Sequence, residues 1–240
     1  LNEEFGDLVK MKGILGRPDL IIAFNPQDFE HVFRNEGPWP YRREFETFKH
    51  FRKKLRSDIY GENAGILVEH GEKWKELRGK VNPVMMQPRA VKPYIKPVEE
   101  VADEFIKRML QLRDSNEELP DDFIIELNKW SLESIARIAL DSRLGCLVDD
   151  ANMNSDSKKM IKAVHDFFTL TFKLEVLPSP WKYIATPAYI KLMKALDVMT
   201  NISLKKIETA IDRFERDPTP KPESDRSVLE KLSKIDKNVA

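Results

Sequence analysis

Three side chains in the stretch 69–78, EHGEKWKELR, have the types and the spacing to hold an anion. His70, Trp74 and Arg78 follow one another at intervals of four residues, and on an α-helix each step of four drifts by only about 40°, so the three share one face. A guanidinium is a planar fork of donors that matches a carboxylate, and an indole N–H and an imidazole N–H can each add a donor. On spacing alone, an ordinary amphipathic helix with a core tryptophan and a solvated arginine is the favoured interpretation.

Composition argues against several other chemistries. Basic and acidic residues balance at 40 each, whereas nucleic-acid binders usually carry a basic excess, so no nucleic-acid partner is expected. Cys146 is the single cysteine, which rules out an internal disulfide. The four histidines form no His-Glu-x-x-His pair, and no metal-ligating residue is assigned. No apolar run reaches the eighteen or so residues that a membrane-spanning helix needs.

The pattern of elements predicts a mainly α protein with a small N-terminal β-hairpin, an α+β class. Residues 8–15 and 20–24 are apolar runs separated by the turn signal GRPD, and Asn25-Pro26 is a cap and first-turn proline for a helix ending near Gly37. Helical periodicity then dominates, with helices expected near 91–112, from 120, over 155–174, and from Thr186-Pro187 to about 214, and with a polar loop at 217–226. We expect one incomplete domain over 1–240, with a β-lobe and first helix in 1–37 and a helical part in 38–240.

Two of these helices carry more specific expectations. The basic stretch after residue 38 places a narrow apolar stripe at Phe45, Phe48, Phe51 and Leu55; a solvated helix with its stripe against the core is favoured, and a surface facing a membrane or an acidic partner is the alternative. In the helix from 120, helical spacing predicts a buried face. Its members are Leu127, Trp130, Leu132, Ile135, Ile138 and Ala139.

Longer stretches of the sequence, which include the candidate anion clamp of His70, Trp74 and Arg78, resemble a known protein family. The pattern Trp-x-x-x-Arg in WKELR, the segment NPQDFEHVFRNEGPWPYR after the hairpin, and the run GILVEHGEKWKELRGKVNPVMMQPRAVKPYIKPVEEVADEFIKRM resemble the N-terminal portion of the cytochromes P450. The mitochondrial clan, and within it an arthropod-like branch, is the most similar. The resemblance implies an incomplete cytochrome P450 fold.

That resemblance implies an enzyme, when complete: a haem-dependent monooxygenase that inserts one oxygen atom from O2 into a small lipophilic substrate. The substrate would be a hormone precursor or a xenobiotic, and the electrons would come from a ferredoxin-type donor. Peripheral membrane contact is implied, at the matrix side of the mitochondrial inner membrane, with the endoplasmic reticulum membrane as the alternative.

The resemblance also assigns residues. His70, Trp74 and Arg78 would bind the haem propionates. The substrate pocket would be lined by Ile66, Leu67, Phe168, Thr171 and Phe172, although the phenylalanines are about equally typical of ordinary core. In the loop 177–189, the membrane contacts would be Trp181, Tyr183 and Ile184; a partly buried interhelical loop is a comparable interpretation.

The family's reactive groups are not found in this stretch. Its haem-ligating cysteine lies in a Phe-x-x-Gly loop, and Cys146 lacks that surrounding, so we predict a small buried hydrophobe there. Glu223 and Arg226 have the spacing of the family's Glu-x-x-Arg motif but stand in a polar loop. No catalytic residue is therefore assigned, and these 240 residues alone are expected to be inactive. The remaining alternative is a catalytically inert fragment or a non-enzymatic helical interaction module, which the sequence downstream of Ala240 would distinguish.

Overall fold

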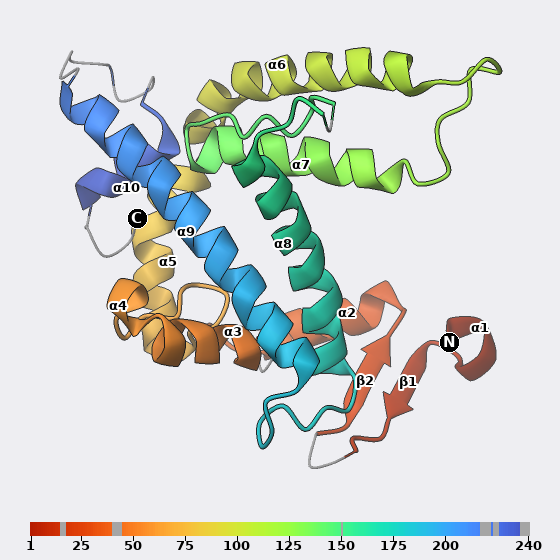
Figure 1. Ribbon diagram of the computed structural model, residues 1–240. Coiled ribbons are helices and arrows are strands. Elements are labelled where there is room, and N and C mark those ends of the chain that lie inside the picture. The colour runs from red at the N-terminus through yellow and green to blue at the C-terminus, as the bar shows by residue number, and fades with distance from the viewer. Residues whose placement is uncertain (15–17, 40–44, 150, 217–221, 223–225, 236–240) are drawn as a thin grey trace. The chain divides into compact units, whose positions relative to one another are not determined.

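A computed structural model describes residues 1–14, 18–39, 45–149, 151–216, 222 and 226–235 (Figure 1). The elements in chain order are α1 (Asn2–Phe5), β1 (Leu8–Met11), β2 (Leu20–Ala23), α2 (Pro26–Asn35), α3 (Glu46–His50), η1 (Phe51–Leu55), α4 (Ser57–Tyr60), α5 (Gly71–Met85), α6 (Pro88–Leu112), α7 (Ile124–Ala139), α8 (Ser155–Thr171), η2 (Phe172–Val176), α9 (Pro187–Arg216) and α10 (Val228–Ile235), where η marks a π-helical turn. The predicted mainly α fold with a small sheet is confirmed. Among the described residues, none of the helices is both long and apolar enough to cross a bilayer.

The sheet is the predicted hairpin, with β1 and β2 antiparallel and Leu8 opposite Ala23. Part of its turn, residues 15–17, lies outside the described residues. The predicted start of α2 is confirmed, because the Asn25 side chain accepts a hydrogen bond of 3.0 Å from the backbone N–H of Gln27 and Pro26 occupies the first helical position. Most of the predicted loop 217–226, including Glu223, also lies outside the described residues.

The chain forms two compact units. Unit 1 contains residues 1–78 and 169–191, and unit 2 contains residues 79–168 and 192–240. Helices α5, α8 and α9 each contribute residues to both units. Unit 1 is therefore discontinuous in sequence, because the whole stretch 79–168 separates its two parts.

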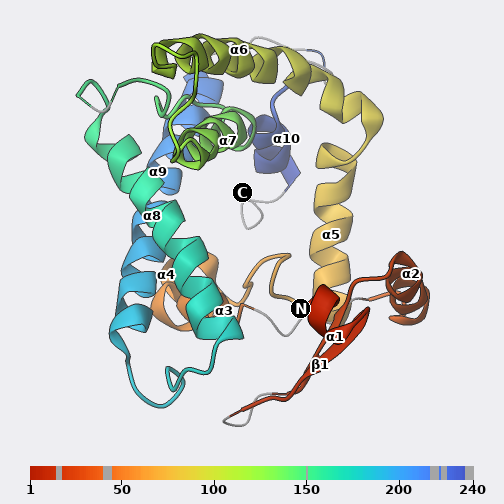
Figure 2. The same cartoon turned by 90° about the vertical axis from the view of Figure 1, so that its right-hand side faces the viewer.

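Unit 2 has its core where α7, α8 and α9 supply apolar side chains around the turn 144–146. The buried cluster consists of Ala136, Leu144, Cys146, Met160 and Ile202. Helices α6 and α7 lie side by side in both views (Figures 1 and 2). Phe105 of α6 stacks on Trp130 of α7 with the ring centroids 5.5 Å apart, which joins the two helices by an aromatic contact.

The predicted buried face of α7 is wrong in part. Ile135 is 59% exposed, and Leu127 and Ala139 are also on the exposed side, whereas Lys129 and Glu133 are buried. The physical reason is that buried backbone N–H groups elsewhere in unit 2 need a hydrogen-bond acceptor from α7. The Glu133 carboxylate accepts hydrogen bonds from the backbone N–H groups of Leu144 (3.1 Å) and Cys146 (2.8 Å), which turns this side of α7 inward.

A second buried polar cluster in unit 2 centres on Arg108 of α6, which is 7% exposed. Arg108 donates to both carboxylate oxygens of Glu126 and, over 3.3 Å, to Asp149. Lys129 Nζ lies 2.9 Å from Glu126 Oε1. Burial raises the pKa of Glu126, but the hydrogen bonds from Arg108 and Lys129 outweigh burial and hold that pKa below its usual range. Each charge in the cluster has a partner of opposite charge, and the cluster joins α6 to α7.

Candidate functional site

The predicted anion clamp lies at the start of α5, in unit 1. Trp74 and Arg78 are one turn apart on the helix, as predicted. His70 is not within the helix, because α5 begins at Gly71, whose φ of +58° lies in the left-handed region. The backbone carbonyl of His70 instead accepts from the N–H of Trp74 at 3.4 Å, so His70 is the residue from which the helix starts. All three side chains are half-buried.

Trp74 carries the most informative atom of this site. Its Nε1 is buried and has no acceptor among the described residues. A buried N–H without an acceptor costs about 1–3 kcal/mol, so such groups are rare unless something else binds them. A carboxylate ligand would supply the missing acceptor, and Arg78 on the next turn would supply the matching positive charge. The residues present therefore fit an anionic group with carboxylate oxygens.

The loop that leads into the clamp is fixed by a carboxylate that sequence reasoning missed. Glu69 is 7% exposed, lies 2.7 Å from Lys53 Nζ, and accepts a hydrogen bond of 2.8 Å from the backbone N–H of Ala64. Burial raises the pKa of Glu69, but the Lys53 ammonium and the Ala64 N–H outweigh it and hold the pKa below its usual range. Glu69 thereby holds the two ends of the loop 64–69, directly before His70, together. No local pattern in the sequence marks Lys53 as its partner.

Arg52 closes the same loop from the other side. It donates to the carbonyl of Ala64 at 2.8 Å, and its guanidinium lies over the rings of Phe48 (4.1 Å) and Tyr60 (4.5 Å). Gly65 has a φ of +87°, and a Cβ there would stand 2.2 Å from an Arg52 nitrogen. The position is therefore open only to glycine without a rearrangement of Arg52.

The predicted substrate residues fall on three segments. Ile66 is half-buried and Leu67 is 51% exposed, both in the loop before α5. Phe168 of α8 is 68% exposed and Phe172, which begins η2, is 57% exposed, so neither is an ordinary core residue in the described structure. Thr171 has a buried Oγ1 with no hydrogen-bond partner among the described residues.

The predicted membrane loop divides into a packed part and an exposed part. Trp181 is 8% exposed and stacks on Tyr189 with the ring centroids 5.6 Å apart, and the edge of His50 meets it at 6.2 Å. Tyr183 and Ile184 are 89% and 66% exposed. Of the three residues predicted to contact a membrane, only Tyr183 and Ile184 are exposed enough to do so.

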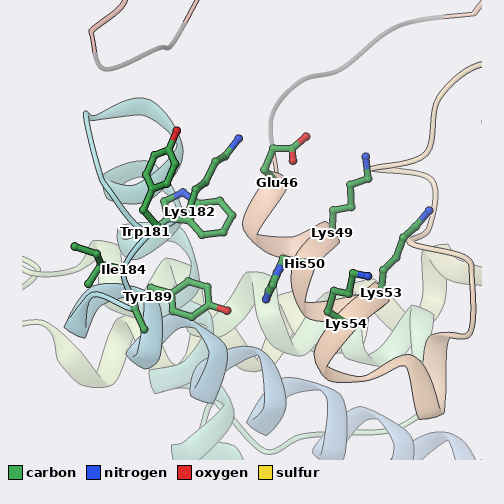
Figure 3. A pocket seen from close by; sticks show the side chains of 11 residues that line it. Glu46, Lys49, His50, Lys53, Lys54, Trp181, Lys182, Ile184 and Tyr189 are labelled. Atoms are coloured by element: carbon green, nitrogen blue, oxygen red, sulfur yellow. The ribbon is translucent and has the colours of Figure 1, made fainter.

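Beside this loop, unit 1 contains a pocket with a cavity volume of about 540 Å³ (Figure 3). One wall comes from α3 and η1, between Glu46 and Lys54, and the other from residues 181–189. The Glu175 carboxylate of η2 accepts a 2.6 Å hydrogen bond from the backbone N–H of Thr47. That N–H belongs to the first turn of α3, so Glu175 caps α3 from a distant part of the chain.

Cys146 fits the prediction of a small buried hydrophobe. It is fully buried in unit 2, and burial raises the pKa of its thiol to about 12, with the nearby Glu133 carboxylate adding to the effect. Within the part of the chain that the structure describes, no group of three or more His, Cys, Asp or Glu side chains could hold a metal ion.

A protein-family model described as Cytochrome P450 matches residues 1–238. The chain belongs to the cytochrome P450 family. Curated relatives include a probable cytochrome P450 12a5, mitochondrial, of Drosophila melanogaster, 38% identical over all of this chain and 45% of the relative, and cytochrome P450 CYP12A2 of Musca domestica, 41% identical over 99% of this chain and 45% of the relative. Cytochrome P450 12b1, mitochondrial, of Drosophila acanthoptera is 36% identical over all of this chain and 44% of its own length.

These cytochromes P450 confirm the resemblance to a mitochondrial, arthropod-like N-terminal portion. The chain spans about half the length of the curated relatives it matches. Haem is the cofactor of the family. Each of its two propionates has a carboxylate of the kind that accepts a hydrogen bond, and the buried Nε1–H of Trp74 has no acceptor among the described residues.

Proposed function

We propose that the whole protein is a haem-dependent monooxygenase that inserts one oxygen atom from O2 into a small lipophilic substrate, with electrons from a ferredoxin-type donor. The family match over 1–238 carries this proposal. Bound haem with a cysteine thiolate ligand supplies the oxygen-activating chemistry. Cys146, buried with a raised thiol pKa, is not that ligand. Units 1 and 2 would then be parts of one domain.

In this proposal His70, Trp74 and Arg78 hold the haem propionates. Support comes from the orphaned Nε1 of Trp74 and from Arg78 on the same face of α5, one turn later. A guanidinium binds a carboxylate by two parallel hydrogen bonds, and an indole N–H adds one more. The role of these residues is to orient the cofactor by its charged edge and to satisfy a donor that is otherwise buried without an acceptor.

The residues proposed to contact the substrate are mainly apolar. Leu67 and Phe172 of unit 1 and Phe168 of unit 2 each expose a large apolar side chain, which suits a lipophilic hormone precursor or xenobiotic. Ile66 would add apolar contact. Thr171, with its orphaned Oγ1, would add one polar anchor.

Relatives named as mitochondrial support a mitochondrial location, and we place the protein at the matrix side of the inner membrane, with the endoplasmic reticulum membrane as the alternative. Peripheral contact would be made by Tyr183 and Ile184, the exposed residues of the loop 177–189. Trp181 would support the loop from within, by its stack on Tyr189.

Two variants of the full-length protein test the haem assignment. Arg78→Ala and Trp74→Phe should both lower the haem content, because each removes a propionate donor. Lys73→Ala, on the exposed side of the same helix, is the matched control and should retain haem. Haem content is read from the absorbance of the purified protein, and normal haem content in Arg78→Ala would refute the assignment.

A second readout separates a ligand role of Trp74 from a merely structural one. In the haem-free protein, Trp74→Phe removes a buried N–H that has no acceptor, so its stability should be unchanged or higher by about 1–3 kcal/mol. In the haem-loaded protein the same change should be destabilising. Destabilisation of the same size in both states would show that the indole only packs.

The thiolate signature tests the enzyme against the inert-fragment alternative. The full-length protein, reduced and exposed to carbon monoxide, should show the Soret band of a haem-thiolate complex, whereas residues 1–240 alone should not. A full-length protein without that band would overturn the monooxygenase proposal in favour of an inert helical module.

A further inference from the structure

The pocket of unit 1 beside the loop 177–189 combines a cavity of about 540 Å³ with an unusual lining. Figure 3 shows Lys49, Lys53 and Lys54 projecting from the helical wall and Lys182 from the loop opposite. Residues far apart in the sequence thus contribute four lysines to the lining of one pocket. Nothing in the proposed haem or substrate contacts uses them.

The charge of this lining is only partly compensated. Lys53 is paired with the buried Glu69, 2.7 Å away. Lys49, Lys54 and Lys182 have no ion pair among the described residues, and Glu46 is the one carboxylate in the described lining. A pocket lined by uncompensated cations attracts an anion and concentrates it there.

The other surface of the pocket is aromatic. Trp181 and Tyr189 are stacked with their planes 7° apart, and the His50 ring meets Tyr189 edge-on at 5.9 Å. Burial raises the pKa of Tyr189, so the phenol adds no negative charge to oppose the lysines. The ligand that fits has an anionic head and an apolar body.

The framework of the pocket is tied together across the sequence. Thr47 in α3 donates its backbone N–H to Glu175 in η2, which fixes the helical wall relative to the segment that leads into the loop. Directly beside Lys182, Tyr183 and Ile184 are largely exposed. Lysine next to exposed aromatic and aliphatic side chains is the pattern of a segment that lies in a membrane interface.

We propose that this pocket binds the phosphate headgroup of an acidic phospholipid, with Lys49, Lys54 and Lys182 around the phosphate. The inference rests on the proposed contact of Tyr183 and Ile184 with a membrane, and it adds a lipid class to that contact. The exposed pair enters the bilayer surface, and the lysines beside it take the charged group that lies at that depth. A free phosphate ion shares the charge but not the apolar body, so the lipid is the better match to the aromatic wall.

The test compares two vesicle types with the full-length protein. Co-sedimentation is measured on vesicles of phosphatidylcholine alone and on vesicles that also contain phosphatidylglycerol. The triple variant Lys49→Gln, Lys54→Gln and Lys182→Gln should lower the partition onto the acidic vesicles by on the order of 100-fold, because each lysine near an anionic surface contributes about fivefold. Binding to neutral vesicles should change little.

A matched control removes the same charge elsewhere. Lys158, Lys159 and Lys162 are exposed on α8 in unit 2, and their change to Gln should alter binding to acidic vesicles by no more than about twofold. An equal loss in both triple variants would mean general charge attraction and would overturn the pocket.

Two further experiments distinguish a failure of the membrane contact from a failure of the headgroup site. Ile184→Ser should weaken binding to both vesicle types; if it has no effect while the lysines still matter, the membrane contact fails and the anion site stands. If wild type binds both vesicles equally in an Ile184-dependent way, the contact stands and the headgroup site fails. Inorganic phosphate at the same concentration as the lipid headgroups should not compete, and full displacement by it would identify a free-anion site instead.

Discussion

Replacing Glu133 should be among the most damaging single changes in unit 2. The carboxylate is fully buried, and its oxygens accept from the backbone N–H groups of Leu144 and Cys146 and from Arg143 Nε, 2.6 Å away. Glu133→Ala leaves two buried N–H groups without an acceptor, at about 1–3 kcal/mol each. Arg143 loses less, because it is about a third exposed and keeps its pair with Glu104. We expect a loss of about 4 kcal/mol in the free energy of unfolding.

Glu133→Gln grades the effect. The amide has one oxygen, so its NH2 group must face a backbone N–H that it cannot satisfy, and about half of the loss, ~2 kcal/mol, should remain. Glu104→Gln is the control, since Glu104 is about half exposed and should cost under about 1 kcal/mol.

Urea unfolding followed by circular dichroism measures these differences, and Glu133→Ala should lower the midpoint by on the order of 1 M. Hydrogen exchange gives the local check, because the amides of Leu144 and Cys146 should lose protection first. A variant within about 1 kcal/mol of wild type, with both amides still protected, would refute the idea that Glu133 organises the 144–146 turn.

Three further outcomes are expected. The folded-state pKa of Glu69 lies below its unfolded value of about 4.3, so its contribution to stability is complete above that pH and is lost as the pH falls toward the folded value; Glu69→Gln should flatten that part of the pH–stability curve, and an unchanged acid limb would contradict the pairing with Lys53. The buried thiol of Cys146 should react with a thiol reagent only on unfolding, and fast labelling of the native protein would show that it is open to solvent. Gly65→Ala should lower the melting temperature, because a Cβ meets Arg52 at a positive φ; an equally stable variant would mean that the loop relaxes freely.

Features that depend on local signals in the sequence agree with the structure. Asn25 and Thr186 are caps whose acceptors lie within three residues of their donors, and both make the expected hydrogen bond, at 3.0 Å and 3.2 Å. The hairpin, the helices and the family resemblance also depend on patterns that lie within short windows. Such features could be predicted because the interacting groups are near neighbours in the chain.

Features set by distant partners could not be predicted in the same way. Apolar periodicity assigned Ile135 to the core, but the buried position belongs to Glu133, whose acceptor role is fixed by N–H groups eleven and thirteen residues away. In the loop 177–189, composition treats Trp181 and Ile184 alike, yet the ring stack with Tyr189 buries only the tryptophan. The lysine pocket likewise exists only after two remote segments meet.

The cap that Glu175 places on α3 has a consequence for synthesis. Its carboxylate lies 128 residues after the N–H that donates to it. The second part of unit 1 begins at residue 169, so it is synthesised only after the whole of 79–168. At about 5–20 residues per second on a ribosome, α3 waits on the order of 10 s for its partner. During that interval the whole of 79–168 is made, so unit 2 begins to gather its helices while the wall of the lysine pocket still lacks its cap.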